Sequence, residues 1–178
     1  MSPARGAVAL GQLREAFDHS FAAAPRPATE AGDHMLAVRV GSRPYVLRLT
    51  ETAGVFAGLP LTPLPGPLPA LCGVTTVRGT VVPVYDLGAL LGDPPAAAPP
   101  RWLALVAGAP PLAVAFAQLD GHLKVPADAL VGHPAGGAAD GCLSALVRLP
   151  DQARGVVDLP TVRTRIHAMT GYPEGTPG

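Results

Sequence analysis

The sequence predicts a mainly β fold, organised as one domain or as two small halves that share a core. Apolar residues make up 48% of the 178 residues and charged residues 15%, which is the opposite of a disordered chain. The apolar residues form short β-branched runs with turn residues between them, a pattern typical of β-barrels and β-sandwiches. The 22 prolines and 21 glycines are therefore expected to end strands rather than to mark disorder.

Residues 1–33 are expected to form an extension in front of the β domain. Apolar side chains recur in it at spacings of 3, 4 and 4, which predicts an amphipathic helix over about 7–23 with these residues on one side: Leu10, Leu13, Phe17 and Phe21. Pro25 and Pro27 end this helix, because proline cannot continue the hydrogen-bond ladder. The helix packs either on its own domain or on a partner, and the sequence leaves both possibilities open.

The first half of the β domain contains two hairpin patterns. Strand-like runs at 35–40 and 45–49 flank a turn, and Val55-Phe56 forms a short third strand. Five prolines within 58–69 predict an extended surface crossing, since proline is excluded from central strands. The second hairpin spans 73–87 and has Arg78-Gly79 at its tip.

The remaining strands follow in a similar rhythm. A proline-containing turn joins two apolar runs, at 102–106 and 112–116. A short strand at 122–125 and a glycine-rich loop at 132–141 come next. A last hairpin pairs 143–149 with 155–159, and a helix then begins at Pro160.

A weak internal repeat, or sequence echo, links the two halves. Residues 82–87 and 155–159 both run as a strand followed by an Asp-Leu pair and a short helix. Asp86 and Asp158 are expected to cap these helices, the first of which covers 87–91. Two similar β halves would explain this echo.

Composition excludes several classes of function. The chain has 13 Lys and Arg against 13 Asp and Glu and only 4% aromatic residues, which argues against nucleic-acid binding. No apolar run reaches the roughly 18 residues that a membrane span needs, so direct membrane insertion is not expected. The five histidines show no metal-ligand spacing and no cofactor motif is present, so neither metal nor cofactor is expected.

The two cysteines, Cys72 and Cys142, are expected to be reduced thiols. Cys72 as a nucleophile with His122 as its base is the one catalytic alternative, but a free cysteine in an apolar stretch is usually a small buried hydrophobe. Arg78 has two possible roles, either a solvated turn residue or an interface arginine whose planar group pairs with a carboxylate.

The segment Gly73-Val74-Thr75-Thr76-Val77-Arg78-Gly79-Thr80-Val81-Val82-Pro83-Val84-Tyr85-Asp86-Leu87 closely resembles the signature of CheW-like domains, roughly G-V-x-N-x-R-G-x-[IV]-[IV]-P-[IV]-x-D-L. The first hairpin with Tyr45, the proline-flanked approach at 65–69 and the closing strand that ends in Asp158 also resemble that family. The resemblance divides the chain into an extension over 1–33, a CheW-like domain over 34–168 and a flexible tail over 169–178.

The resemblance implies a pair of five-stranded SH3-like β-barrels and no enzyme activity. It implies a cytoplasmic adaptor, recruited to chemoreceptor arrays, that couples the cytoplasmic tip of methyl-accepting chemoreceptors to the regulatory domain of the histidine kinase CheA. The partner-binding residues expected by resemblance follow the central motif: Thr76, Val77, Arg78, Gly79 and Val81. The structural residues of the motif are Gly73, Pro83, Asp86 and Leu87, with Asp158 at the second Asp-Leu pair.

Three departures from the family pattern bear on this expectation. The family asparagine is Thr76 here, a commonly acidic position is Gly54, and the helix over 7–23 lies outside the core domain. They leave open a divergent paralogue that serves a pathway other than flagellar taxis. The alternatives are a scaffold of the same fold without kinase coupling, and a small cytosolic ligand-binding β-barrel or enzyme with its site between the halves.

Overall fold

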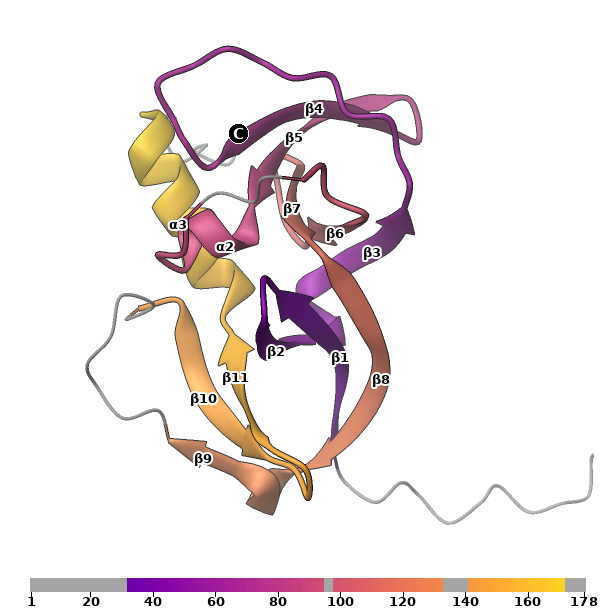
Figure 1. Ribbon diagram of the computed structural model, residues 1–178, viewed down its shortest axis with the longest axis vertical. Coiled ribbons are helices and arrows are strands. Elements are labelled where there is room, and N and C mark those ends of the chain that lie inside the picture. Colours follow the sequence, from indigo (N-terminus) through magenta and orange to yellow (C-terminus); the bar gives the residue numbers. More distant parts are fainter. Residues whose placement is uncertain (1–31, 95–97, 133–140, 172–178) are drawn as a thin grey trace, which may run out of the picture. The chain divides into compact units, whose positions relative to one another are not determined.

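The computed structural model describes residues 32–94, 98–132 and 141–171, and these residues form two antiparallel-rich sheets with short helices (Figure 1). The predicted helix over 7–23 lies outside the described residues. The mainly β fold is confirmed, and both cysteines are free. None of the described helices is both long enough and apolar enough to cross a membrane.

The first sheet has six strands. Their order is β8 (Gln118–Pro126), β1 (Gly32–Val40), β2 (Arg43–Arg48), β11 (Ala153–Val157), β10 (Leu143–Arg148) and β9 (Leu130–Gly132). The expected strand at 122–125 is therefore only part of β8, and β9 occupies a segment for which no strand was expected. A 3-10 turn, η2 (Ala127–Ala129), joins β8 to β9, so the chain itself connects the two edges of this sheet.

The second sheet has five strands. Their order is β3 (Thr52–Ala57), β6 (Trp102–Val106), β7 (Leu112–Phe116), β5 (Thr80–Asp86) and β4 (Leu71–Val77). The third strand expected at Val55-Phe56 is thus six residues long, and it follows β2 through a 3-10 turn, η1 (Leu49–Glu51). The expectation of five strands in each half is correct for this sheet and wrong for the first, where β9 adds a sixth.

The two sheets share one arrangement. In each, two hairpins meet through a parallel pair, β2 with β11 in the first sheet and β7 with β5 in the second. The hairpins β1–β2 and β10–β11 thus correspond to β6–β7 and β4–β5, and β8 corresponds to β3. The echo predicted two similar halves, but the halves are not consecutive, because the first sheet takes its strands from both sides of β3–β7.

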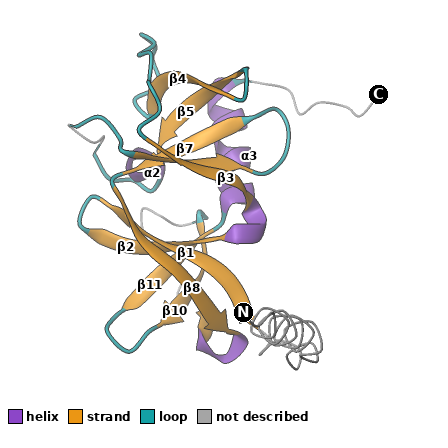
Figure 2. Cartoon of the chain, turned by 90° about the vertical axis from the view of Figure 1, so that its right-hand side faces the viewer, coloured by secondary structure: helices purple, strands orange, loops and turns teal. Residues whose placement is uncertain are grey.

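Each sheet has its own core on one face and a shared core on the other. On β7, Ala113 and Ala115 belong to the core of the five-stranded sheet, whereas Val114 and Phe116 belong to the shared core. On β2, Val46 faces the core of the six-stranded sheet. Figure 2 shows one sheet above the other with α2 (Leu87–Leu90) between them, and α2 contributes to the shared core.

Both Asp-Leu pairs act as predicted. The Asp86 carboxylate accepts hydrogen bonds from the backbone N–H groups of Gly88 (2.7 Å) and Ala89 (3.1 Å) at the start of α2. The Asp158 carboxylate accepts from the N–H of Thr161 (2.9 Å) in α3 (Leu159–Thr170). Because each N-cap satisfies backbone donors that would otherwise lack a partner, both helices start where the aspartate stands.

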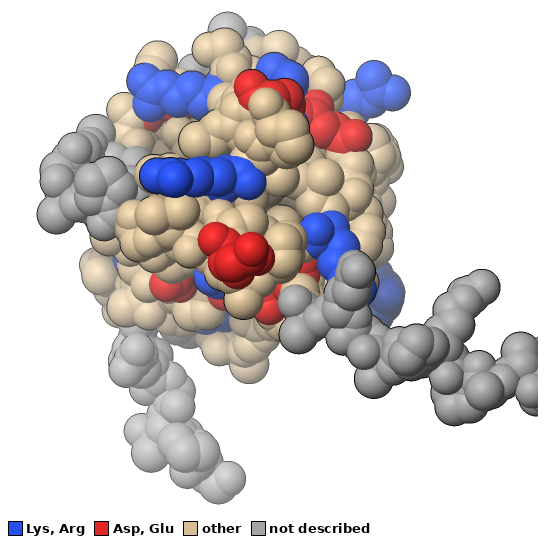
Figure 3. Space-filling model, turned by 90° about the horizontal axis from the view of Figure 1, so that it is seen from below, with Lys and Arg blue, Asp and Glu red and all other residues tan. Residues whose placement is uncertain are grey.

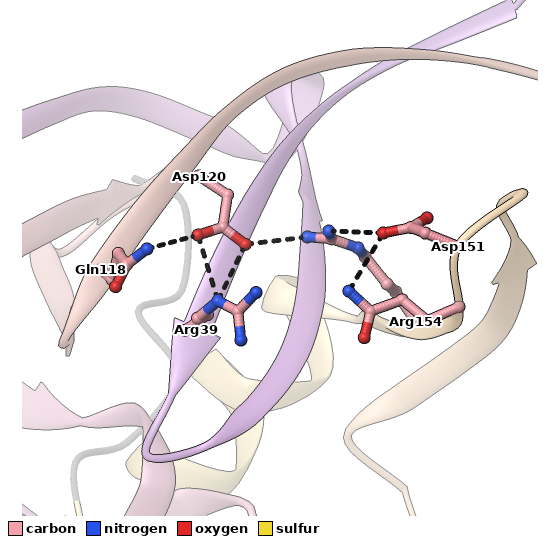
Figure 4. Close-up of polar contacts among 6 residues, drawn as sticks. Arg39, Gln118, Asp120, Asp151 and Arg154 are labelled. Atoms are coloured by element: carbon pink, nitrogen blue, oxygen red, sulfur yellow. Dashed lines mark hydrogen bonds and ion pairs between the residues drawn. The ribbon is translucent and has the colours of Figure 1, made fainter.

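A carboxylate on β8 ties together the strands of the six-stranded sheet (Figure 4). Asp120 accepts from Nε of Arg39 at 3.2 Å, from Nη1 of Arg154 at 3.2 Å and from the side-chain amide of Gln118 at 2.8 Å. Arg154 is 7% exposed and also lies 3.7 Å from Asp151. Burial acts to raise the pKa of Asp120, but the hydrogen bonds from Arg39 and Arg154 outweigh it and the pKa is lowered.

Asp120→Asn is expected to lower the free energy of unfolding by about 1–3 kcal/mol at pH 7, because Arg154 loses the nearer of its two charged partners. A carboxyl group whose pKa is lower in the folded than in the unfolded state stabilises the fold at pH values above its unfolded pKa, which is about 3.9. This stabilisation is lost as the pH falls through the folded pKa. Urea unfolding at pH 7 and pH 3 should therefore show the two proteins converging in acid. The control is Asp128→Asn on η2, since no ion pair of Asp128 is found in the described part of the chain. A difference in unfolding free energy between wild type and Asp120→Asn that is the same at pH 7 and pH 3 would contradict the prediction.

Candidate functional site

The tip of the β4–β5 hairpin is a two-residue turn with unusual backbone geometry. Val77 pairs with Thr80, and both residues between them have positive φ, 50° for Arg78 and 81° for Gly79. Two positive φ values characterise the type I′ turn, which matches the twist of the flanking strands and prefers Asn-Gly or Gly-Gly. Arg78 is the only non-glycine with positive φ among the described residues, and it is held there at a cost of about 1–2 kcal/mol.

The two faces of this hairpin differ sharply. Val77 is 6% exposed and packs in the core of the five-stranded sheet, so its side chain does not reach a partner surface. Thr76 and Val81 pair with each other across the strands and both point to the outside. Val81 is 62% exposed, the highest value among the large exposed hydrophobic residues of the described chain.

A groove of about 410 Å³ opens beside Val81. We call it the Val81 groove and define it by its lining: Val81, Pro83, Tyr85, Pro110, Pro111, Leu112, Ile166, His167 and Thr170. It runs along the face of β5 opposite the core of the five-stranded sheet, from exposed Val81 to buried Tyr85, past the turn before β7 and to the last turns of α3. Most of its lining is apolar, and burial raises the pKa of Tyr85 at its floor.

Two contacts hold α3 as the wall of the groove. At its N-terminus, the N–H of Leu159 donates to Glu51 at 3.0 Å, which adds to the Asp158 cap. Farther along, Arg163 donates to the carbonyl of Pro110 at 2.6 Å and to that of Val106 at 3.0 Å. Arg163 therefore fixes the β6–β7 turn against the helix, and its burial lowers its pKa.

The proline-rich crossing lies against the free edge of β4. Thr62 and Val74 exchange two backbone hydrogen bonds, of 2.8 and 2.9 Å, and the hydroxyl of Thr75 donates to the carbonyl of Pro60 at 2.7 Å. This contact protects part of an edge strand that would otherwise be open to other chains. The predicted crossing at 58–69 is thus extended and lies outside the central strands, as expected.

The predicted motif residues take distinct places. Thr76, Arg78, Gly79 and Val81 lie together at the outer end of the hairpin, Pro83 lines the groove, and Gly73 is buried beneath the crossing. Leu87 is fully buried in the shared core. The sequence did not single out the α3 residues of the groove, because only the tertiary fold brings residues 166–170 next to residues 81–85.

The catalytic alternative finds no support in the geometry. Cys72 lies on β4 in the five-stranded sheet, whereas His122 lies on β8 in the six-stranded sheet and hydrogen-bonds to His34 instead. Burial raises the pKa of the Cys72 thiol to about 11, so the thiol is protonated at neutral pH. A protonated, half-buried thiol without a base is a poor nucleophile.

Charges of both signs are interspersed on the face that Figure 3 shows. Lys and Arg side chains lie next to Asp and Glu side chains there, in keeping with the equal totals in the sequence. This face offers no single-sign surface of the kind that tracks a nucleic-acid backbone.

Comparison with known proteins places this architecture. The family model of the CheW-like domain matches residues 34–165. Among curated proteins, the chain is 31% identical over 64 residues to "Chemotaxis protein CheW" of Rhizobium meliloti and 32% identical over 65 residues to the protein of that name from Bacillus subtilis. Each match covers 36% of this chain, and the chain spans about two-fifths of these relatives (41% and 42%).

A solved structure has the same fold. The scaffolding protein TtCheW of Thermoanaerobacter tengcongensis superposes with a TM-score of 0.65 at 13% sequence identity, over 72% of this chain and 90% of that one. Identity at this level supports a common fold, and function has to be argued from the site itself.

Proposed function

This chain belongs to the CheW-like domain family, and we propose that it is a non-enzymatic chemosensory adaptor that couples methyl-accepting chemoreceptors to the histidine kinase CheA. The curated relatives are chemotaxis proteins and the solved neighbour is a scaffolding protein, which supports an adaptor in chemotaxis. In this proposal the domain predicted over 34–168 forms two SH3-like barrels and carries the partner surfaces, between an extension over 1–33 and a tail over 169–178. The described elements extend slightly beyond both ends of this domain, because β1 begins at Gly32 and α3 ends at Thr170. The protein acts in the cytoplasm and is recruited to receptor arrays.

The observation that carries the proposal is Arg78. A glycine or asparagine would relieve the strain of its turn, yet a long charged side chain stands there, exposed, at the tip of the hairpin whose strand β5 lines the apolar Val81 groove. Backbone strain at an exposed position supports a hypothesis of function. Arginine is also one of the residue types enriched among the hot spots of protein interfaces.

In the proposed mechanism, the tip of a helical receptor hairpin places apolar side chains into the Val81 groove, and Arg78 pairs with a carboxylate at its rim. An amphipathic helix recognises such a groove through side chains spaced three and four residues apart. The regulatory domain of CheA binds a separate surface of the same domain. Many weak contacts of this kind assemble an array through avidity rather than through one tight bond.

Arg78→Gly is expected to separate binding from stability. The melting temperature should stay the same or rise, because glycine adopts the positive φ of this position without strain. Affinity for a soluble chemoreceptor cytoplasmic fragment should fall about tenfold, since the charged partner is lost. Calorimetric titration of the fragment into wild type and variant, beside thermal unfolding of both, measures the two effects.

Arg78→Lys serves as the matched control for charge, and its affinity for the receptor fragment should lie between those of wild type and Arg78→Gly. Unchanged affinity in Arg78→Gly would mean that Arg78 is only a solvated turn residue. Pull-down with CheA tests the coupling separately, because binding to receptor without CheA identifies a scaffold that lacks kinase coupling. Binding to neither partner would overturn the adaptor and favour a ligand-binding barrel.

A further inference from the structure

A pair of histidines lies on the six-stranded sheet, away from the sheet that carries Val81. His34 on β1 and His122 on β8 are 88 residues apart in the chain, yet Nδ1 of His34 and Nε2 of His122 lie 2.9 Å apart. The ring centroids are 5.0 Å apart and the ring planes differ by 18°. Both side chains are exposed, so ions in solution can reach the facing nitrogens.

The strand register fixes this approach. β1 and β8 are antiparallel, with Leu36 opposite His122 and His34 opposite Lys124, so the two histidines are diagonal neighbours on one face of the sheet. The paired main chain holds their Cα atoms in place. Of the charged groups nearby, Lys124 faces His34 across the strands, and Asp33 is engaged by Arg48 at 3.5 Å.

We propose that His34 and His122 together chelate a divalent transition-metal ion of the Cu²⁺ and Ni²⁺ class. Metal–nitrogen bonds to imidazole are about 2.0–2.1 Å long, so two nitrogens 2.9 Å apart subtend an angle of about 90° at the ion. That is the angle between neighbouring positions in the square-planar or tetragonal geometry of Cu²⁺ and Ni²⁺. A tetrahedral Zn²⁺ site at the same bond length requires about 3.3 Å between the nitrogens, so it fits less well.

Binding needs no change in the number of protons on a neutral pair. Without metal, one ring N–H fills the gap between the two nitrogens. On binding, that proton moves through water to the far nitrogen of the same ring, and both facing nitrogens then donate their lone pairs to the ion. In the hydrogen-bonded pair the two facing nitrogens point at each other, and because the side chains are exposed, rotation about the Cα–Cβ and Cβ–Cγ bonds can swing both lone pairs toward one ion beside them.

The remaining coordination positions stay open to water. Within the described ranges, no group of three or more His, Cys, Asp or Glu side chains gathers around a common point, so the protein supplies two ligands here. An open two-histidine site is a surface chelate rather than a closed structural site. The proposal does not depend on the adaptor function.

Titration of Cu²⁺ into the full chain tests the chelate. His34→Gln and His122→Gln should each lower the affinity about tenfold or more, because either change leaves a single imidazole. The double variant should lose only the small residual affinity of one imidazole beyond either single variant, since one loss already destroys the chelate. The matched control is His167→Gln on α3, which removes an imidazole of the same chemistry and should leave Cu²⁺ affinity unchanged.

Electron paramagnetic resonance of the Cu²⁺ complex gives a second readout that does not depend on folding. The wild-type spectrum should show coupling to two equatorial imidazole nitrogens, and the His34→Gln spectrum to one. The same Cu²⁺ affinity in wild type and both single variants, or the same nitrogen coupling in all of them, would overturn the proposal.

Discussion

Gly73→Ala is expected to destabilise the protein by at least about 3 kcal/mol. Gly73 has φ of +145°, where an L-residue is strained by about 1–3 kcal/mol. A Cβ atom there would also overlap the backbone carbonyl oxygen of Thr62, so the crossing must move off β4. The two hydrogen bonds between Thr62 and Val74 would then be lost together with the packing of Leu59 and Leu61 against the sheet.

Gly121→Ala is the matched control. Gly121 has nearly the same φ, +148°, but a Cβ there meets no atom within 4 Å. This variant carries the backbone strain without the collision, so its free energy of unfolding should fall by only about 1 kcal/mol or slightly more. Urea unfolding of both variants measures the difference, and equal losses would show that the crossing contributes nothing beyond the strain at Gly73.

Val81→Glu is expected to weaken binding of the receptor fragment about thirtyfold, which corresponds to the 2 kcal/mol that defines an interface hot spot. The reason is that a carboxylate at the mouth of the Val81 groove must be desolvated when an apolar partner enters. The fold should be unaffected, because Val81 is 62% exposed and its neighbour across the strands, Thr76, is polar. Calorimetric titration measures the affinity, and circular dichroism checks the fold.

Leu64→Glu provides the control for this variant. Leu64 is also a large exposed hydrophobic residue, at 44%, but it lies on the proline-rich crossing and does not line the Val81 groove. Its affinity for the receptor fragment should match that of the wild type. If both variants weaken binding equally, the effect comes from added negative charge in general and the groove is not the docking site.

Most of the strands could be predicted from the sequence because their apolar residues are contiguous and glycine or proline marks their ends. β8 shows why others could not. It is an edge strand whose first half has polar residues such as Gln118 and Asp120 in alternation, so the sequence pattern revealed only residues 122–125 of its nine. β9 is three residues long and precedes a glycine-rich segment, which left no pattern to read.

The candidate site could be predicted only in part, for a related reason. The hairpin motif is continuous in sequence, so Thr76, Arg78 and Val81 could be singled out. The α3 wall of the same groove could not, because Ile166, which lines the groove as Val81 does, comes 85 residues later in the chain. Burial of Val77 was also not foreseen, since a turn tip gives no indication of which face is inside. The pairing of His34 with His122 depends on the register of β1 and β8, which no local pattern encodes.

The placement of β3–β7 between the two parts of the other sheet has a consequence for biosynthesis. All five strands of the second sheet leave the ribosome as one uninterrupted stretch, and they can pair before synthesis ends. β1 and β2, the first two of the described strands to be made, must wait, because residues 45–47 acquire their parallel neighbours only when residues 155–157 emerge. A nascent chain therefore carries an unsatisfied strand edge for most of its translation, and a stalled or C-terminally truncated product would expose that edge to aggregation.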